Sequence, residues 1–308
     1  MTLREDQPDD RAPEKGARRS TAAAVLALVR LPDWTKNLFV LAPLFFSDSF
    51  TDTGQVARAL AAFFGFSLAA SAVYVLNDWC DREEDAAHPT KRTRPIAAGE
   101  VDGRQAAVIG TALVAGSAAI GLAAGLPGGY WLALGAYLAI NVAYSTFLRD
   151  ADLVDVCIVA AGFVLRVLAG SAAIGVAASP WIILSTGLLA LLLVLGKRRA
   201  DLALEGGGGR SSLAGYSVEF IDVSLAALAA STIGFYALFT LSDYTRRKFG
   251  TEDLYLTTFF VVVGVLRYLQ LVITRKAGGS PTTIALTDRP MQVIIVAWLV
   301  TFGLIAFT

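Results

Sequence analysis

Nine long apolar runs are the feature of this sequence that most constrains its fold. Each is long enough, or nearly so, to cross a hydrocarbon core of about 30 Å, and each is bounded by polar, Gly or Pro-containing segments. The runs lie at residues 37–50, 56–76, 105–125, 129–147, 152–177, 180–196, 219–241, 254–273 and 290–308. Charged residues make up only 17% of the chain, below the roughly 25% that is typical of a soluble protein. The sequence therefore predicts an all-α polytopic membrane protein with nine transmembrane helices in a single bundle.

The distribution of Lys and Arg predicts how this bundle is oriented, because positively charged flanks stay in the cytoplasm. If each run crosses once, 20 of the 26 Lys and Arg fall on the side of the N-terminus, and only Arg58, Arg246, Arg247 and Lys248 fall on the other. We therefore expect a multi-pass protein of a bacterial plasma (inner) membrane, with its N-terminus in the cytoplasm and its C-terminus outside. Residues 1–20 are polar and charged, which predicts a disordered cytoplasmic tail before a membrane domain at 21–308.

Two cysteines and one histidine are too few for a zinc site, and both cysteines fall near the reducing cytoplasmic face. The net charge of zero gives no indication of nucleic-acid binding, and we expect no nucleic-acid partner. The sequence is compatible with a homo-oligomer but does not specify one.

The densest polar stretch runs from Asn77 to Asp85 and directly follows the second apolar run. If the helix continues through this stretch, Asn77, Asp81 and Asp85 lie at i, i+4 and i+8, with Asp78 on nearly the same face. Carboxylates on one face repel one another unless a cation lies among them, and Mg²⁺ prefers such hard oxygen ligands. We predict that these four side chains bind Mg²⁺; the alternative is a solvated acidic loop.

A basic cluster follows immediately, at Lys91, Arg92 and Arg94. Beside a metal that neutralises part of a polyphosphate, Arg and Lys side chains can bind the remaining phosphate oxygens. The alternative is a cluster that only fixes the topology of the chain. Its position next to the carboxylates favours a polyphosphate site.

Two charged residues fall at the start of the fifth run or within it, Asp155 and Arg166. A charge there costs about 2.5 to 3.5 kcal/mol on insertion scales unless it faces a polar cavity, so both are candidates for a functional site. A structural partner elsewhere in the bundle is the alternative for Arg166. The two residues are about three helical turns apart, which is too far for them to pair directly.

The sixth run ends at Gly196, before Lys197 and two arginines. Lys197 is a candidate for substrate binding, with a membrane-edge anchor as the alternative. The glycines at 206–209 follow no strand and lack the Walker lysine pattern, so they indicate a flexible loop rather than a phosphate-binding loop.

Together these motifs resemble the UbiA-type intramembrane prenyltransferase superfamily, and they look closest to its decaprenyl-phosphate phosphoribosyltransferase branch. Residues 77–85 match the NDxxDxxxD signature of the superfamily. Further matching stretches lie at 30–37, 88–99, 144–145 with Asp155, 196–198, 249–251, 267–269 and 286–290. Asp152 and Asp155 are three apart, whereas members that prenylate aromatic rings carry two aspartates four apart, which favours the phosphoribosyltransferase branch.

The resemblance implies a nine-helix bundle with two Asp-bearing cytoplasmic loops over a lateral cavity that is accessible to lipid. It also implies that Mg²⁺ holds the diphosphate of phosphoribosyl pyrophosphate and that the acceptor is a polyprenyl phosphate. The 5-phosphoribosyl group would move to the lipid phosphate, with release of pyrophosphate. The expected site residues are Asp78, Asp81 and Asp155 for catalysis; Lys36, Lys91, Arg92, Arg94, Tyr144, Arg166 and Lys197 for substrate binding; and Asn77, Asp78, Asp81 and Asp85 for the metal.

Two other functions stay open at this point. A UbiA-type prenyltransferase would use the same metal site to move a prenyl group from a prenyl diphosphate to an aromatic or polar-lipid acceptor. A transporter or channel would also show many spans and charges within the membrane. The gathering of acidic and basic motifs on one side of the membrane favours an enzyme over a transporter.

Overall fold

The computed structural model describes residues 20–47, 51–148, 153–205, 216–274 and 281–307, and all regular elements in these ranges are helices, as predicted. Eight helical segments there are long and apolar enough to cross a membrane, and they match eight of the predicted runs. They are built from α3 (Thr53–Cys80), α5 (Gly103–Ala123), α6 (Gly128–Ala143) with the π-helical turn η4 (Tyr144–Leu148), α7 (Val154–Ile174), α8 (Pro180–Glu205), α9 (Val218–Leu241), η6 (Asp253–Thr257) with α11 (Thr258–Leu269) and the π-helical turn η7 (Gln270–Thr274), and α13 (Arg289–Phe307).

The first predicted run, residues 37–50, is not a continuous helix. Helix α1 (Thr21–Val29) ends before its C-cap residue Arg30, whose φ is 52°, and the 3₁₀ helix η1 (Leu31–Val40) and the short α2 (Ala42–Phe45) follow. Pro32 explains the break, because proline has no backbone N–H to continue the ladder of α1. Among the described residues, eight of the nine expected spans are thus long helices and the first is a broken one; the predicted residues 48–50 lie outside the described part of the chain.

Segment η1 packs along α3 in the antiparallel direction. The indole Nε1 of Trp34 donates to Ser71 Oγ at 3.1 Å, and the amide of Asn37 donates to Ser67 Oγ at 3.0 Å. On its other side η1 contacts α7, where Gly170 lies directly against the backbone of Val40. The broken segment is thus held between two continuous helices by hydrogen bonds and a close backbone contact.

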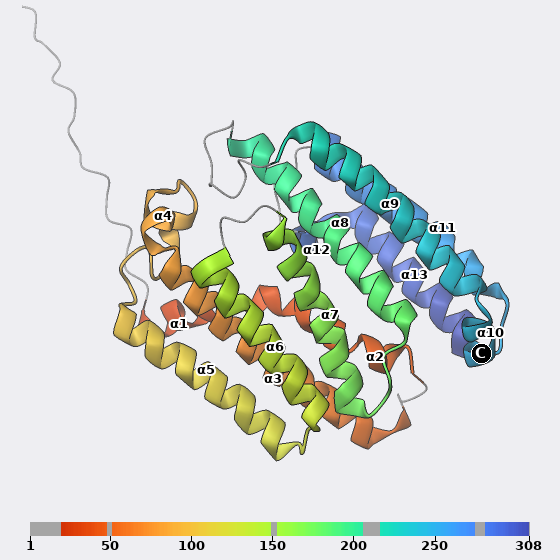
Figure 1. Ribbon diagram of the computed structural model, residues 1–308, viewed down its shortest axis with the longest axis horizontal. Coiled ribbons are helices and arrows are strands. Elements are labelled where there is room, and N and C mark those ends of the chain that lie inside the picture. The colour runs from red at the N-terminus through yellow and green to blue at the C-terminus, as the bar shows by residue number, and fades with distance from the viewer. Residues whose placement is uncertain (1–19, 48–50, 149–152, 206–215, 275–280, 308) are drawn as a thin grey trace, which may run out of the picture.

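The long helices form two groups that lie side by side (Figure 1). Helices α3, α6 and α7 share one apolar core with η1, and α5 packs against α3. Helices α8, α9, α11 and α13 share a second core, which includes Leu192, Leu225 and Val265. Contact between α7 and α8 joins the two groups.

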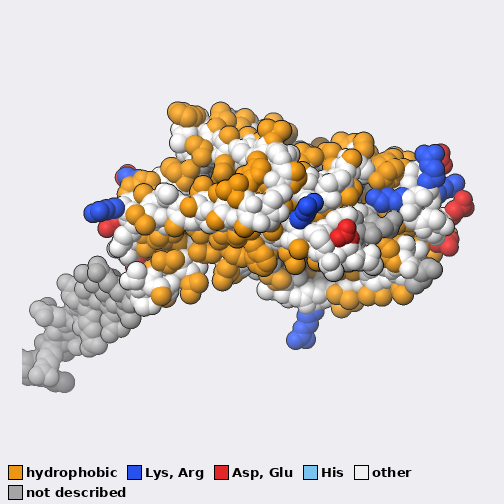
Figure 2. Space-filling model, turned by 90° about the horizontal axis from the view of Figure 1, so that it is seen from below, with side chains coloured by type: hydrophobic (Ala, Val, Ile, Leu, Met, Phe, Trp, Pro, Cys, Tyr) orange, Lys and Arg blue, Asp and Glu red, His pale blue; other side chains and the backbone are white. Residues whose placement is uncertain are grey.

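Short helices lie at the ends of the long ones: α4 (Arg82–Ala87), η3 (Lys91–Thr93), α10 (Asp243–Phe249) and α12 (Pro281–Thr287). Helix α8 continues beyond the predicted end at Gly196 to Glu205. The residues after Gly196 are mostly Lys, Arg, Ala, Leu and Glu, which are good helix formers. Figure 2 shows a face that is covered mainly by hydrophobic side chains, with charged ones gathered toward its right end, as expected of a chain that faces lipid.

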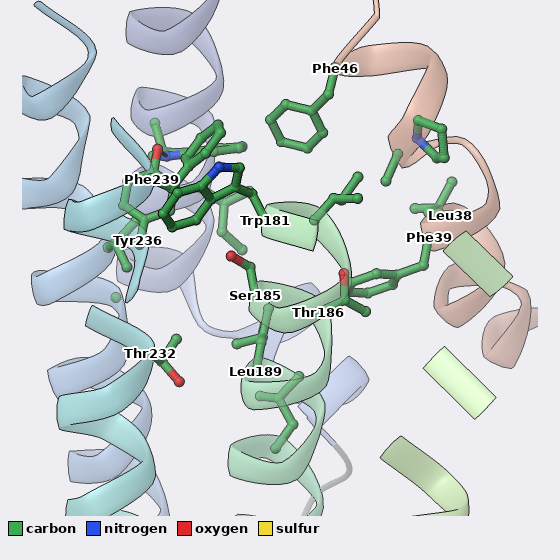
Figure 3. Close-up of a pocket in the computed structure, with 18 of the residues that line it drawn as sticks. Leu38, Phe39, Phe46, Trp181, Ser185, Thr186, Leu189, Thr232, Tyr236 and Phe239 are labelled. Carbon is green, nitrogen blue, oxygen red and sulfur yellow. Dashed lines mark hydrogen bonds between the residues drawn. The ribbon is translucent and has the colours of Figure 1, made fainter. Parts of the chain in front are cut away.

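A cavity of 760 Å³ lies between the two groups of helices. Its wall is mostly apolar and is built from η1, α2, α8, α9, α11 and α13. Leu38 and Phe39 line it on one side, Trp181 and Leu189 lie along α8, and Tyr236 lies across from η1 on α9 (Figure 3). The described part of the bundle therefore contains an apolar chamber within the membrane region.

We expect Gly170→Ala to destabilise the fold, because a Cβ on Gly170 would lie 1.8 Å from the carbonyl oxygen of Val40. No side-chain rotation can relieve a clash with backbone, so η1 would have to move away from α7. Overpacking of this kind typically costs about 1 to 3 kcal/mol, which should lower the midpoint of thermal unfolding in detergent by several degrees. The control is Gly234→Ala in α9, where nothing lies within 4 Å of the added Cβ. Equal midpoints for the two variants would contradict the close approach.

Candidate active site

The Asp motif begins in the last turn of α3 and ends in α4, so it does not form the single continuous helix on which the expected spacing depended. Helix α3 ends at Cys80, Asp81 has φ −90° and ψ 0°, and α4 begins at Arg82. This break avoids a row of like charges stacked along one helix face. It brings Asp78 and Asp85 together instead, with only 2% and 1% of each residue exposed.

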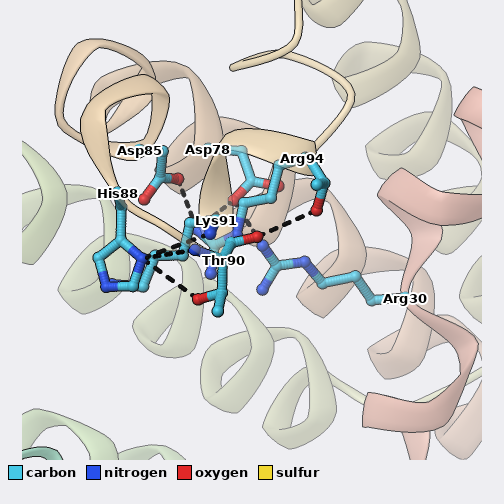
Figure 4. A network of polar contacts seen from close by, with 8 residues as sticks. Arg30, Asp78, Asp85, His88, Thr90, Lys91 and Arg94 are labelled. Atoms are coloured by element: carbon cyan, nitrogen blue, oxygen red, sulfur yellow. Dashed lines mark hydrogen bonds and ion pairs between the residues drawn. The ribbon is translucent and has the colours of Figure 1, made fainter. Parts of the chain in front are cut away.

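Two arginines from distant parts of the chain bind these carboxylates (Figure 4). Arg94 Nη1 lies 3.0 Å from Asp78 Oδ1 and 2.6 Å from Asp85 Oδ2, so one nitrogen bridges both residues. Arg30 Nη2 donates to Asp78 Oδ1 at 2.5 Å. The break between α1 and η1 falls at Arg30 itself. Sequence reasoning missed this role of Arg30, although the arginine stands beside Pro32, which marks the break.

The two polar loops that the sequence singled out also meet. Ser145 Oγ on η4 donates to the side-chain oxygen of Asn77 at the end of α3. Tyr144 precedes Ser145 on the same turn and is half-buried, as is Asp81. The structure thus gathers Asn77, Asp78 and Asp85 with the start of the second loop; Arg149, Asp150 and Asp152 lie outside the described residues.

The basic cluster divides into residues that face the carboxylates and residues that do not. His88 Nδ1 accepts hydrogen bonds from the backbone N–H of Thr90 and of Lys91, which shapes the turn into η3. Lys91 is half-buried beside the network in Figure 4, and Arg94 binds the carboxylates directly. Arg92 is exposed.

Asp155 forms a second buried ion pair, at the N-terminal end of α7. Arg198 Nε and Nη2 both lie 2.7 Å from Asp155 Oδ2, and the Tyr216 hydroxyl donates to Oδ1 at 2.9 Å. Burial, followed by this hydrogen bond to Asp155, raises the pKa of Tyr216 to about 12, so the phenol stays protonated and can donate at physiological pH. Both carboxylate oxygens of Asp155 are therefore already engaged by protein groups.

Sequence reasoning named Lys197 rather than Arg198. Lys197 is exposed, whereas the next residue on α8 points into the bundle. Successive residues on a helix point about 100° apart, so the sequence alone could not say which of the adjacent cations faces Asp155.

Arg166 lies inside the bundle and is 5% exposed. Its Nε donates to Asn37 Oδ1 at 2.7 Å and its Nη2 donates to the Tyr137 hydroxyl at 3.2 Å. The guanidinium also contacts the rings of Phe66, Tyr137 and Phe163, each within 5.3 Å of the centroid. Arg166 thus has partners within the bundle, as the alternative interpretation expected, but it forms no ion pair within the described part of the chain.

The carboxylates near Arg94 suit a metal ion that takes its other ligands from water and from substrate phosphates. No three His, Cys, Asp or Glu among the described residues converge into a preformed metal site. Asp85 Oδ1 is nevertheless buried without a hydrogen-bond partner, a condition that is costly unless another group satisfies the oxygen. Because Mg²⁺ usually takes part of its shell from water and substrate phosphates, Asp78 and Asp85 need supply only some of its ligands.

Comparison with known proteins identifies relatives of the whole chain and of its fold. The model of the UbiA prenyltransferase family matches residues 37–279. The decaprenyl-phosphate phosphoribosyltransferase of Mycolicibacterium smegmatis is 33% identical over 96% of both chains, and that of Corynebacterium glutamicum is 33% identical over 91% of this chain and 86% of its own. The fold is similar to that of a UbiA homologue from Archaeoglobus fulgidus bound to GPP and Mg²⁺, with a TM-score of 0.69 and 20% identity over 92% of this chain and 100% of that one.

We expect Arg198→Ala to destabilise the protein strongly, because it leaves the Asp155 carboxylate buried without its cation. Breaking a buried pair in this way typically costs about 3 to 5 kcal/mol, which should appear as a large fall in the thermal midpoint in detergent. The control is Arg246→Ala, which breaks a pair with Glu252 whose side chains are 43% and 76% exposed. Exposed pairs contribute about 0 to 1 kcal/mol. A smaller loss for Arg198→Ala than for Arg246→Ala would show that Asp155 does not depend on Arg198.

Proposed function

This chain belongs to the UbiA prenyltransferase family, and on that premise we propose that it transfers the 5-phosphoribosyl group from phosphoribosyl pyrophosphate to a polyprenyl phosphate, releasing pyrophosphate. The observation that carries the proposal is the 33% identity to decaprenyl-phosphate phosphoribosyltransferases over nearly the whole of this chain. The site supports the same chemistry, because it combines clustered carboxylates with several cations at one end of the bundle.

The reaction exchanges one bond for another at C1 of the ribose. The bond from C1 to the pyrophosphate oxygen breaks, its electron pair leaves with pyrophosphate, and an oxygen of the lipid phosphate forms the new bond to C1. That oxygen is already anionic at neutral pH, so the protein need not supply a strong general base. His88 lies beside the carboxylates, but its Nδ1 accepts hydrogen bonds from the backbone of the turn into η3, which is consistent with a structural role in this chemistry.

Residues Asn77, Asp78, Asp81 and Asp85 are the proposed metal ligands. Bound Mg²⁺ would neutralise charge that develops on the leaving pyrophosphate. Arg94 lies among the carboxylates, and Lys91 lies beside them, so both can bind the phosphate oxygens that the metal leaves uncovered. Arg30 holds Asp78 in place from the other side.

The polyprenyl tail requires an apolar space within the membrane, and the sequence could not locate it. The 760 Å³ cavity between the two groups of helices has the required character (Figure 3). It extends from Phe249 near α10 to Leu286 and Met291 near α12, and it reaches Thr35 on η1. We therefore assign the tail of the acceptor to this cavity.

The orientation of the protein is part of the proposal. The clusters around Asp78 and Asp155 lie at the end of α3, the start of α7 and the end of α8. Because adjacent helices run antiparallel, these three ends lie on the same side of the bundle (Figure 1). The excess of Lys and Arg on that side supports its placement in the cytoplasm, where a soluble phosphorylated sugar donor would reach it.

The decisive experiment supplies purified protein in detergent with ribose-labelled phosphoribosyl pyrophosphate and decaprenyl phosphate, with and without Mg²⁺. We expect Mg²⁺-dependent entry of label into the lipid phase. Asp81→Ala should abolish this transfer but keep the thermal midpoint, because the half-exposed Asp81 belongs to neither apolar core. Glu83→Ala removes an exposed acid from the same motif and should keep wild-type activity. Transfer of a prenyl group to an aromatic acceptor, with no label in the lipid, would overturn the proposed function.

The basic cluster should determine affinity for the donor, because the 5-phosphate needs cationic partners. At least one of Lys91→Ala, Arg92→Ala and Arg94→Ala should raise KM for phosphoribosyl pyrophosphate by roughly 10- to 150-fold, as expected for loss of a charge-assisted hydrogen bond. KM for the polyprenyl phosphate should change far less. Arg104→Ala removes an exposed cation near the start of α5 and is the matched control. Unchanged donor affinity in all three variants would show that the cluster serves only topology.

A further inference from the structure

Tyr74 lies on α3 one turn before Asp78, so the two side chains share a face of the helix. The side chain is half-buried, yet no described residue forms a hydrogen bond with its hydroxyl. A hydroxyl inside an apolar bundle normally has a partner, so this one is available to a ligand.

Cations surround Tyr74. The guanidinium of Arg30 lies 5.1 Å from the centroid of the Tyr74 ring, and Lys36 Nζ lies 5.7 Å from it. Arg166 on α7 lies farther along the bundle, against the rings of Tyr137 and of Phe66, which precedes Tyr74 by about two turns on α3. Two positive charges, from η1 and its N-cap, thus lie against the Tyr74 ring.

The carboxylates nearby do not balance all of these charges. Arg30 is paired with Asp78, and Lys36 is paired with Asp33 at 2.6 Å. Arg166 forms no ion pair within the described ranges, although it is almost completely buried. A buried cation without a counterion is costly, so the local charge favours binding of an anion.

The location of Tyr74 indicates which anion belongs there. Four residues of α3, about 6 Å along the helix axis, separate it from the proposed pyrophosphate site at Asp78. The nucleophilic oxygen has to approach the donor carbon to about 3 to 3.5 Å, so the acceptor phosphate must lie next to that site. The apolar cavity runs along the segment that carries Lys36, because Thr35, Leu38 and Phe39 of η1 line it.

We propose that Tyr74 and Lys36 form the subsite that binds the phosphate of the acceptor lipid, with Arg166 as a positioning residue behind them. The assignment rests on the proposed function. The Tyr74 hydroxyl donates a hydrogen bond to a phosphate oxygen, and Lys36 neutralises its charge. Arg166 holds Asn37, the neighbour of Lys36, and so fixes the position of η1.

The 5-phosphate of the donor has the same chemistry as the lipid phosphate, so the test must separate these two sources. Tyr74→Phe removes the hydroxyl but keeps the ring that Arg30 and Lys36 contact. It should raise KM for the polyprenyl phosphate roughly tenfold or more, while KM for phosphoribosyl pyrophosphate and the thermal midpoint stay nearly unchanged. The control is Tyr130→Phe, which removes a buried hydroxyl elsewhere in the bundle and should leave both constants unchanged. A rise in the donor KM instead would assign the subsite to the 5-phosphate and overturn the proposal.

A binding measurement without donor or Mg²⁺ tests the subsite independently of turnover. In native mass spectrometry, wild-type protein should retain polyprenyl phosphate in preference to the corresponding polyprenol. Tyr74→Phe and Lys36→Gln should lose most of this preference, and Tyr130→Phe should keep it. An unchanged preference in both subsite variants, or none in the wild type, overturns the proposal. If the wild type transfers no label from phosphoribosyl pyrophosphate, the proposed function fails, and the binding preference still decides whether a lipid phosphate is held at Tyr74.

Discussion

An apolar bundle can hold charged side chains only where each charge finds a partner, and the carboxylate of Asp78 is where this constraint organises the molecule most strongly. Its partners come from both sides, Arg30 before η1 and Arg94 after η3. Arg94 also binds Asp85 on α4. One buried network therefore ties the first segment, the end of α3 and the following loop together, and it does so next to the proposed metal ligands.

The same principle joins the two groups to each other and the helices of the second group among themselves. Asp155 and Arg198 connect α7 with α8, Arg199 and Asp222 connect α8 with α9, and Arg267 and Asp288 connect α11 with the N-terminus of α13. Each pair lies near helix ends at the side of the bundle that carries the site. Hydrophobic packing alone specifies little about the relative positions of lipid-facing helices, so these directional contacts supply the register.

Much of the fold could be predicted from the sequence because long apolar runs leave few alternatives to membrane helices. The first segment was the exception, since its local structure depends on Pro32 and on the approach of Gly170 to Val40, which the apolar pattern does not encode. The charged stretches after α3 and at the start of α7 do lie at one end of the bundle, whereas Arg166 lies inside it. The partners of these stretches could not be predicted, because choosing Arg198 over Lys197 requires the rotation of α8 relative to α7.

The distribution of charge also explains how two anionic substrates could meet in a membrane protein. Around Asp78 and Asp85, carboxylates and arginines are interleaved, which suits a metal-bound polyphosphate rather than a bare phosphate. Deeper in the bundle, beside Phe66 and Tyr137, Arg166 lies without a carboxylate of its own, and the local balance shifts toward positive charge. Two phosphorylated ligands repel each other, and cations between them lower the cost of approach. The change from paired to unpaired cations would therefore place the two substrates at different depths. The diphosphate would lie at the end of the bundle that carries Asp78, and the lipid phosphate would lie deeper inside.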